Sequence, residues 1–345
     1  MESILSQTDL KEVIRNKFKC SDFEVVEWTF KKDYQSSGFY GLPSKEYVAL
    51  KLEGEKVVGL HMFIRQTPTT KCYHGELMDK LQVFSKEALM HDSLLKQISP
   101  YIDGKTYPEC YLARKDRLII LEDLKVLGFK SIGITNTFDL DQIESTLKTL
   151  SKLHAGSIIY EEKTGNKLDE TYADALTETY FVPDINHPWF HNGCTSMNAI
   201  EAIVEAYFPH TPPEVYEKAY DILRTLPYRV IPSRKYRNVL VNGCITAGNV
   251  LFKSNEEEGV TESVITNFQQ ARYNTPALDV LLAILLTTNS MLRSNNFESL
   301  LVHYYNNFSR ELTEQGIETK TILTWVQFNE SVHDALPTAQ AMAII

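Results

Sequence analysis

The chain has 345 residues, of which 43% are hydrophobic and 23% are charged. Acidic residues (45) outnumber basic residues (35), which gives a formal net charge of -10. This is the wrong sign for a protein that neutralises many phosphates of DNA or RNA, so we expect no nucleic-acid partner. The apolar content excludes a disordered chain, and the length allows one large two-lobed domain or two ordinary domains.

Cysteine usage and the absence of long apolar segments indicate the cellular environment. Five cysteines are widely spaced and form no C-x-x-C pair, so neither a disulfide framework nor a zinc finger is predicted. No secretory signal is visible, and the densest apolar run, 280–286, is far shorter than the roughly 20 residues that cross a bilayer. We therefore expect a cytoplasmic protein with no membrane partner.

The N-terminal third combines helix and strand patterns. Apolar residues at helical spacing between 10 and 18 predict a helix, and alternating residues at 23–30 predict a strand. Beyond a turn-rich stretch at 38–44, the runs 47–52 and 57–65 predict two more strands in an antiparallel meander.

Two further helices and a strand follow. An apolar stripe between 77 and 88, with Glu87 beside it, predicts a helix, and residues 117–121 predict a strand. Asp139 followed by Gln142 matches a capping box and predicts a helix over 139–156.

Helices dominate the remainder of the chain. We expect helical segments over 170–228 around a loop at 183–192, two helices within 276–316, and a tail at 336–345. Short strand signals lie on either side of an acidic turn that reads as a hairpin tip, at 239–241, 250–252 and 264–265.

These elements predict an α+β protein with two lobes. The smaller lobe, residues 1–123, would contain an antiparallel sheet and one major helix. The larger, mainly helical lobe, residues 124–345, would carry a hairpin-like segment at 239–269. Such an arrangement commonly binds a ligand in the crevice between the lobes.

The common catalytic motifs are absent. The chain has no G-x-S-x-G, H-E-x-x-H, G-x-G-x-x-G or P-loop pattern. His187, His191 and Cys194 have a spacing that suits a metal, but Pro188 argues against both histidines projecting from one helical turn. We interpret the aromatic residues around them, including Phe181, as lobe packing or as the wall of a pocket.

Five segments form an ordered set that covers most of the chain. They lie at 63–68, 84–87, 121–124 with 128–129, 153–155, and 239–252 with 264–269. In order and spacing they resemble the insect ecdysteroid kinase-like family, a branch of the choline and aminoglycoside phosphotransferase group. The resemblance implies a protein-kinase-like fold with ATP and Mg²⁺ between the lobes.

In active members, the resemblance implies, a lysine on the third strand holds the ATP phosphates and pairs with a helix glutamate. Phosphoryl transfer depends on positioning and charge stabilisation, so cations must surround the phosphates. Here Arg65 stands at the lysine position and Glu87 at the glutamate position. Arginine keeps the charge, but its planar fork does not replace a compact ammonium group.

The resemblance also assigns the segment between the lobes. Glu122, Asp123 and Leu124 match the family's hinge, whose backbone contacts the adenine. A strand with a polar end would have the same residues, so this match does not discriminate between an active and an inactive protein.

The catalytic loop departs from the family pattern, which is His-Gly-Asp followed five residues later by Asn. Asn242 replaces the histidine and Cys244 replaces the aspartate, which positions or deprotonates the substrate hydroxyl. A thiol, with a reference pKa of about 8.5, accepts such a proton only when it is ionised. Asn249, which binds magnesium in the family, is retained, and so is Asp279, which matches an aspartate that braces the loop.

The second magnesium position is also altered. The family has Asp-Phe-Gln, and this chain has Asn267 in place of that aspartate. Magnesium is normally anchored by one or two carboxylates together with phosphates. We therefore expect weakened ATP and Mg²⁺ binding, if it is retained at all.

Three hypotheses remain open at this stage. The first is a pseudokinase, inactive or very weak, that binds a nucleotide or a small apolar ligand between its lobes. The second is an active small-molecule kinase that phosphorylates an ecdysteroid-type alcohol. The third is a carrier for a steroid-like ligand without a nucleotide. The sequence does not determine the ligand or the oligomeric state.

Overall fold

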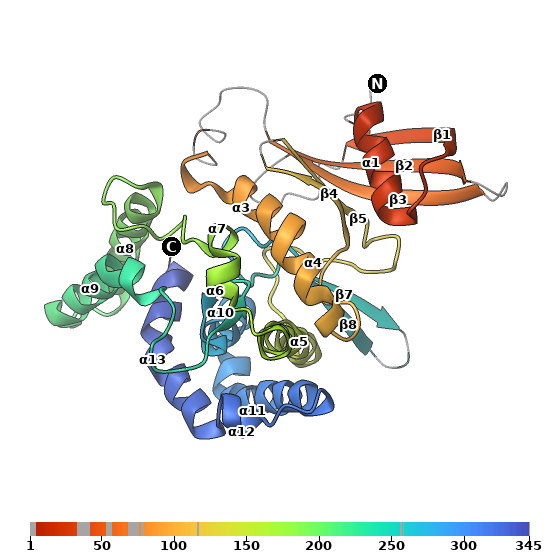
Figure 1. The fold of residues 1–345 in the computed structure, drawn as a ribbon. Helices are drawn as coiled ribbons and strands as arrows, with labels where there is room; N and C mark the ends of the chain where they lie inside the picture. Colours follow the sequence, from red (N-terminus) through yellow and green to blue (C-terminus); the bar gives the residue numbers. More distant parts are fainter. Residues whose placement is uncertain are drawn as a thin grey trace.

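The computed structural model describes residues 5–32, 42–52, 57–67, 76, 79–115, 117–255, 257 and 259–344. A sheet-rich part carries the N-terminus and a larger helical part carries the C-terminus (Figure 1). The expected α+β class with two lobes is therefore confirmed.

The N-terminal sheet has five antiparallel strands in the order β1-β2-β3-β5-β4. Their bounds are β1 (Phe23–Lys32), β2 (Leu42–Leu52), β3 (Val57–Gln66), β4 (Cys110–Arg114) and β5 (Leu118–Glu122). The predicted meander of three strands is confirmed, and β4 was not predicted. The expected turn at 38–44 falls partly outside the described residues, but β2 already begins at Leu42, so the end of that turn is wrong.

Helix α1 (Gln7–Phe18) forms where the sequence predicts it. Ser6 caps its N-terminus in a reciprocal capping box with Asp9. Its apolar stripe, which includes Leu10, Val13 and Ile14, is buried in a cluster with residues of the sheet. Burial of this one face is what holds a short helix against a sheet.

A continuous helical run connects the two parts of the molecule. It consists of α3 (Val83–Leu89), the π-helical turn η1 (Met90–Leu94), α4 (Leu95–Ile98) and the short 3₁₀ turn η2 (Ser99–Tyr101). Its apolar residues between 90 and 98 belong to the main core cluster of the helical part. The division of the chain at residue 123 remains a prediction.

The helical part is built around α5, which begins after the predicted cap Asp139 and is capped at its C-terminal end by Gly165. Its helices are α5 (Leu140–Thr164), α6 (Leu168–Thr171), α7 (Ala173–Leu176), α8 (Pro188–Tyr207), α9 (Pro213–Arg229), α10 (Pro276–Thr287), α11 (Ser290–Glu314), α12 (Thr319–Ile322) and α13 (Trp325–Ile344). The predicted helices within 139–156 and 276–316 are confirmed.

Two small sheets lie within this part. Strands β7 (Val250–Asn255) and β8 (Gly259–Ile265) form the predicted hairpin around the acidic turn. Strand β6 (Val239–Val241) instead pairs with β9 (Arg272–Asn274), a strand that was not predicted. This pairing brings the segment after β6 next to the segment before β9.

Two other predictions are wrong. Helix α8 begins at Pro188, inside the expected loop at 183–192, because proline is well accommodated in the first turn of a helix. Residues 336–344 of the expected tail at 336–345 belong to α13, in which Ala339 and Ala341 are buried, and residue 345 lies outside the described residues. Small residues there allow close packing, so an apparently featureless segment forms part of the core.

Within the described residues, no helix combines the length and the apolar character needed to cross a membrane. The cysteines that the structure describes, Cys20, Cys110, Cys194 and Cys244, are all free thiols.

Candidate active site

Asp279 of α10 holds the loop after β6 through hydrogen bonds to its backbone. The backbone N–H groups of Asn242 and Gly243 donate hydrogen bonds of 2.6 and 2.8 Å to the two carboxylate oxygens of Asp279. His154 Nε2 lies 3.3 Å from the same carboxylate, and His154 Nδ1 shares a 2.7 Å hydrogen bond with the Tyr304 hydroxyl. This bracing is what the resemblance implied for Asp279.

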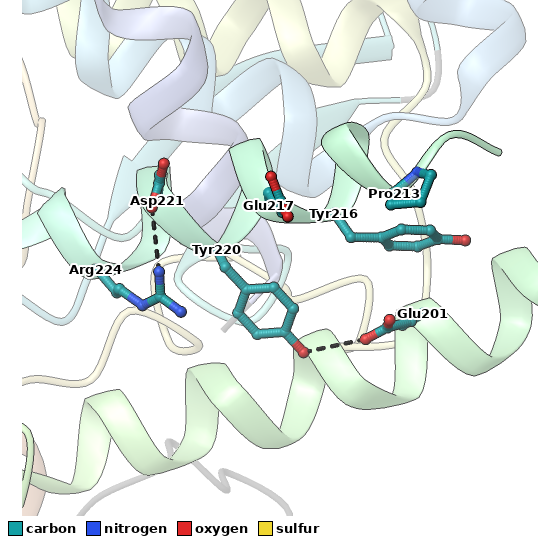
Figure 2. A pocket seen from close by; sticks show the side chains of 7 residues that line it. All are labelled: Glu201, Pro213, Tyr216, Glu217, Tyr220, Asp221 and Arg224. Carbon is teal, nitrogen blue, oxygen red and sulfur yellow. Dashed lines mark hydrogen bonds and ion pairs between the residues drawn. The ribbon is translucent and has the colours of Figure 1, made fainter.

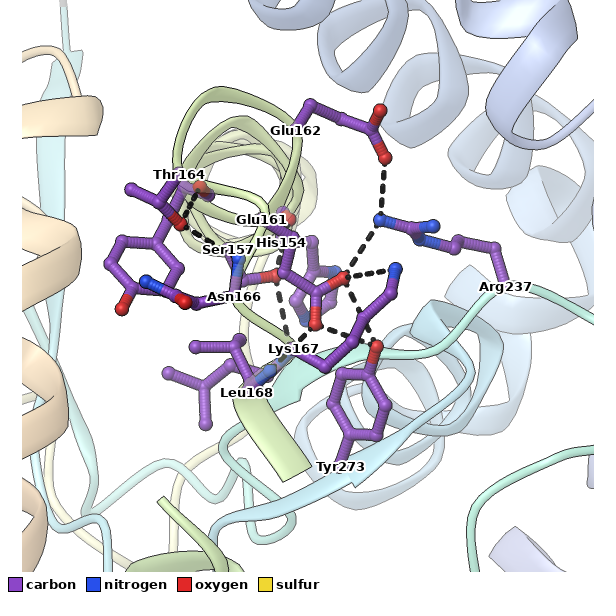
Figure 3. A network of polar contacts seen from close by, with 12 residues as sticks. His154, Ser157, Glu161, Glu162, Thr164, Asn166, Lys167, Leu168, Arg237 and Tyr273 are labelled. Carbon is purple, nitrogen blue, oxygen red and sulfur yellow. Dashed lines mark hydrogen bonds and ion pairs between the residues drawn. The ribbon is translucent and has the colours of Figure 1, made fainter. Parts of the chain in front are cut away.

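One face of α5 supports the same region. His154, Ser157 and Glu161 follow each other at helical spacing (Figure 3). The Ser157 hydroxyl accepts a hydrogen bond from Leu240 N at 3.1 Å, and the Tyr273 hydroxyl donates to Glu161 at 2.9 Å. The helix therefore fixes both strands, β6 and β9, that flank the loop.

Gly243 is required by the shape of the loop. Its φ is +79°, and a Cβ atom placed on it would lie 2.2 Å from the carbonyl oxygen of Gln270. Any other residue would meet both backbone strain and a steric clash.

Cys244 occupies the position where the family pattern has an aspartate. Its backbone N–H donates to Asn242 Oδ1 at 3.2 Å, and its carbonyl accepts a 2.8 Å hydrogen bond from Asn249 Nδ2. Burial raises the pKa of the Cys244 thiol to about 11, although Arg272 acts in the opposite direction. The group is therefore a neutral thiol near pH 7 and cannot serve as a base.

Asn242, at the position of the family's histidine, is fully buried and links two segments. Its Oδ1 accepts from Cys244 N, and its Nδ2 donates to the backbone carbonyl of Asn267 at 3.1 Å. The amide thus contributes to the geometry of the loop.

The two predicted metal-binding residues contact each other. Asn249 donates its Nδ2 to a carbonyl, so its Oδ1 must be the acceptor, and Asn267 Nδ2 donates to it at 3.1 Å. This fixes the orientation of both amides. Asn267 Oδ1 remains buried and without a hydrogen-bond partner among the described residues.

The amide oxygens of Asn249 and Asn267 are poor ligands for a magnesium ion. One amide oxygen is free, the other already accepts a hydrogen bond, and neither carries a negative charge. In the part of the chain that the structure describes, no three His, Cys, Asp or Glu side chains gather as a metal site. Magnesium in nucleotide sites needs one or two carboxylates, so no reaction step can be assigned to a metal held here.

The predicted pair of Arg65 and Glu87 forms. Arg65 Nη1 of β3 donates to Glu87 Oε2 of α3 at 2.5 Å, and both side chains are buried. Gln269 Nε2 donates to the same oxygen at 3.2 Å, which connects the N-terminal part to the segment after β8. His91 lies nearby, and burial lowers its pKa to about 4, so it is neutral.

The side chains of the predicted hinge, residues 122–124, contact other residues of the protein. Glu122 pairs with Lys105 at 2.5 Å, and Asp123 Oδ1 accepts from the backbone N–H of Lys125 at 3.1 Å. Leu124 is buried in a small cluster with Phe129. An adenine contact through the backbone of these residues remains a prediction.

Sequence reasoning assigned no role to three further residues beside the loop. Lys86 of α3, Glu178 after α7 and Arg272 of β9 form a polar cluster. A charged residue inside a short apolar segment, such as Arg272 between Ala271 and Tyr273, was the available signal. Their partners lie far away in the sequence, so the cluster could not be assembled from spacing.

Among the described residues, His187, His191 and Cys194 are not gathered into a group that could hold a metal ion. His187 precedes the first turn of α8, whereas His191 lies within the helix. The neighbouring aromatic residues Phe181 and Trp189 are buried in a cluster with α9 and α13. Of the two interpretations of this segment, lobe packing is correct.

A surface cavity of about 480 Å³ lies between α8 and α9 (Figure 2). None of the residues of the catalytic loop contributes to its lining, which is mostly charged. The lining residues are Glu201, Pro213, Tyr216, Glu217, Tyr220, Asp221 and Arg224. Such a lining does not suit the apolar ligand of a carrier protein.

The sequence pattern of the ecdysteroid kinase-like family matches residues 47–317, most of the chain. The chain belongs to this family. In this ecdysteroid kinase-like protein, Cys244 and Asn267 stand where the family pattern has two aspartates. No curated protein sequence matches the chain.

Several solved structures are similar to this ecdysteroid kinase-like protein. Choline kinase LicA from Streptococcus pneumoniae is 10% identical, with a TM-score of 0.41, and the match covers 97% of this chain and 99% of the other. A microcompartment-associated aminopropanol kinase is 9% identical, with a TM-score of 0.40, and the match covers 97% of this chain and 95% of the other. The GDP and kanamycin complex of APH(2")-IIIa is 11% identical, with a TM-score of 0.39, and the match covers 98% of this chain and 90% of the other.

Proposed function

We propose that this protein is a pseudokinase of its family, which transfers phosphate very slowly or not at all. The observation that carries the proposal is the hydrogen bond between Asn267 Nδ2 and Asn249 Oδ1, at the position where a metal would bind. A neutral amide pair offers Mg²⁺ neither a carboxylate nor two free oxygens. Without the metal, the charge that develops on the phosphates lacks its main stabilisation.

The neutral thiol of Cys244 supports the same conclusion. A catalytic base needs a pKa near the working pH, whereas burial raises the pKa of this thiol to about 11. General acid–base catalysis contributes typically about 10² to 10⁴ in rate, so its loss alone is severe. Both losses act on one reaction centre.

The intact features favour a retained binding function. The ion pair of Arg65 and Glu87 joins β3 to α3, and Asp279 braces the loop after β6. We propose that a nucleotide or a small molecule such as a steroid-like alcohol binds between the lobes, in the cytoplasm, without being converted.

Phosphate transfer from labelled ATP to a panel of steroids and other small alcohols tests the proposal. The wild-type protein should turn over far more slowly than about 1 per second, the ordinary enzymatic range. The double variant Cys244→Asp with Asn267→Asp should be at least ~10-fold faster, because it restores both carboxylates. Cys244→Asn with Asn267 unchanged is the control of similar size without charge, and it should remain slow. Wild-type turnover of about 1 per second or more would refute the proposal.

A further inference from the structure

Two buried cations lie beside the catalytic loop. Arg272 of β9 and Lys86 of α3 each have a relative exposure of 2%. They come from opposite parts of the molecule. Arg272 lies against Glu178, which follows α7, and Lys86 donates to the carbonyl of the preceding residue, Thr177. Buried charges of this kind are stable only when they are paired and hydrogen-bonded.

The contacts of Arg272 leave much of its guanidinium group unsatisfied. Its Nε donates to the carbonyl of Gln270 at 3.1 Å and lies 3.1 Å from Glu178 Oε2. Its Nη1 and Nη2 are buried and have no hydrogen-bond partner within the described residues. An unsatisfied buried donor carries its full desolvation cost, and the cost is larger for a charged group.

One carboxylate balances the two cations. Glu178 Oε1 accepts hydrogen bonds from the backbone N–H groups of Tyr180 and Phe181, both at 2.8 Å, and its Oε2 faces Arg272. Lys86 donates to the carbonyl of Thr177 at 2.6 Å and forms no ion pair with a described residue. Among these three side chains, two cations therefore share one carboxylate. The Asp279 carboxylate, which also acts on Cys244, already accepts hydrogen bonds from the backbone of Asn242 and Gly243.

The Arg272 side chain lies next to Cys244. A Cβ atom placed on Gly243, the preceding residue, would be 3.4 Å from Arg272 Nε. The family pattern has an aspartate where Cys244 stands, and a carboxylate there would balance the cluster. The neutral thiol does not.

We infer that an oxyanion of a small molecule, a carboxylate or a phosphate, binds against the Arg272 guanidinium beside Cys244 and accepts hydrogen bonds from its Nη1 and Nη2, which have no partner in the described part of the chain. The planar fork of arginine matches both groups with two parallel hydrogen bonds. The inference goes beyond the proposed function, because it requires neither a nucleotide nor phosphate transfer.

Access and a further donor support this assignment. Cys244 is half-buried and the Glu178 side chain is 19% exposed, so the cluster reaches the surface at these two residues. The hydroxyl of Thr179 is also buried without a partner among the described residues. Burial, and to a smaller extent the proximity of Arg272, lowers the pKa of Lys86 to about 8 despite Glu178.

Titration calorimetry on the full chain tests the inference with sodium acetate and inorganic phosphate as probes, at an ionic strength held constant with chloride. The wild-type protein should bind at least one probe, and Cys244→Asn is the uncharged variant with which Cys244→Asp is compared. Cys244→Asp should bind it at least ~10-fold more weakly, because the introduced carboxylate occupies the guanidinium. Arg224→Gln, which removes an exposed arginine on α9, should bind like the wild type.

The outcomes separate clearly. Tighter binding of acetate identifies a carboxylate ligand, and tighter binding of phosphate identifies a phosphate ester. The inference is overturned if neither probe binds the wild-type protein, or if Cys244→Asp binds as tightly as Cys244→Asn. None of these measurements involves ATP, so their failure is distinct from failure of the proposed function.

Discussion

Asn267 has a φ of +68°, a left-handed conformation that asparagine and aspartate adopt more readily than other residues with a side chain. An asparagine in the place of the family's aspartate therefore keeps the backbone unchanged. What changes is the charge and the direction of hydrogen bonding, since the amide donates to Asn249. At the scale of single residues, the loop geometry accommodates an asparagine, and the amide offers a cation no negative charge.

Gly243 provides a direct test of how strongly the loop shape depends on one residue. The substitution Gly243→Ala should destabilise the protein by about 3 kcal/mol or more, because the strain of a positive φ adds to a clash with a carbonyl oxygen. Chemical denaturation followed by circular dichroism measures the change.

Gly165→Ala is the matched control. Gly165 has a similar φ of +72°, but a Cβ there would have no atom within 4 Å. The control should cost only about 1 kcal/mol, since it carries the backbone strain alone. Equal losses for the two variants would mean that the close approach of Gln270 is unimportant.

At the scale of elements, the helical run from α3 to α4 joins the sheet to the helical core. Glu87 holds Arg65 of β3 on one side, while His91 packs edge-on against Phe268 on the other. A histidine in this position must remain uncharged, and burial lowers its pKa to about 4.

This histidine makes the stability of the protein sensitive to acid. The unfolded chain has a His91 pKa near 6.5, so between pH 6.5 and 4 the unfolded state binds more protons than the folded state. Stability should therefore fall as the pH falls through this window, by up to about 3 kcal/mol from His91.

Urea denaturation at a series of pH values measures this effect. Other groups also titrate in the same range, so the informative quantity is the difference between the wild-type protein and His91→Gln, whose side chain stays neutral. The variant should show a shallower loss of stability below pH 6.5. Parallel curves for the two proteins would contradict the prediction.

Elements with their own periodicity or caps could be predicted from the sequence. Helix α5 has both a capping box and an apolar stripe, and β1 to β3 alternate clearly. Strands β4 and β9 could not be predicted, because they are short and are defined by their partners. Helix α13 was not predicted either, and its residues 336–344 were expected to form a tail.

The same limit applies to the site. The replacements at Cys244 and Asn267 were visible from motif order alone. The hydrogen bond that orients both amides, and the contact of Arg272 with Glu178 across 94 positions of sequence, depend on side-chain directions that spacing does not encode.

At the scale of the whole molecule, the C-terminal end of α13 belongs to the core. Ala339 is fully buried, whereas Ala343 is exposed on the same helix. Ala339→Asp should destabilise the protein by about 3 kcal/mol or more, because it buries an unpaired charge. Ala343→Asp should change stability by no more than about 0.5 kcal/mol. In thermal or urea unfolding, equal and small effects would indicate a free tail instead.

The bracing of the loop by Asp279 has a consequence for how such a protein can evolve. The groups that hold the loop, Asp279, His154 and Gly243, are different from the groups at the positions of chemistry, Cys244 and Asn267. Mutations that remove catalysis therefore need not lower folding stability, and selection for a folded protein does not oppose them. By the same logic, charge can return at these two positions without rebuilding the scaffold.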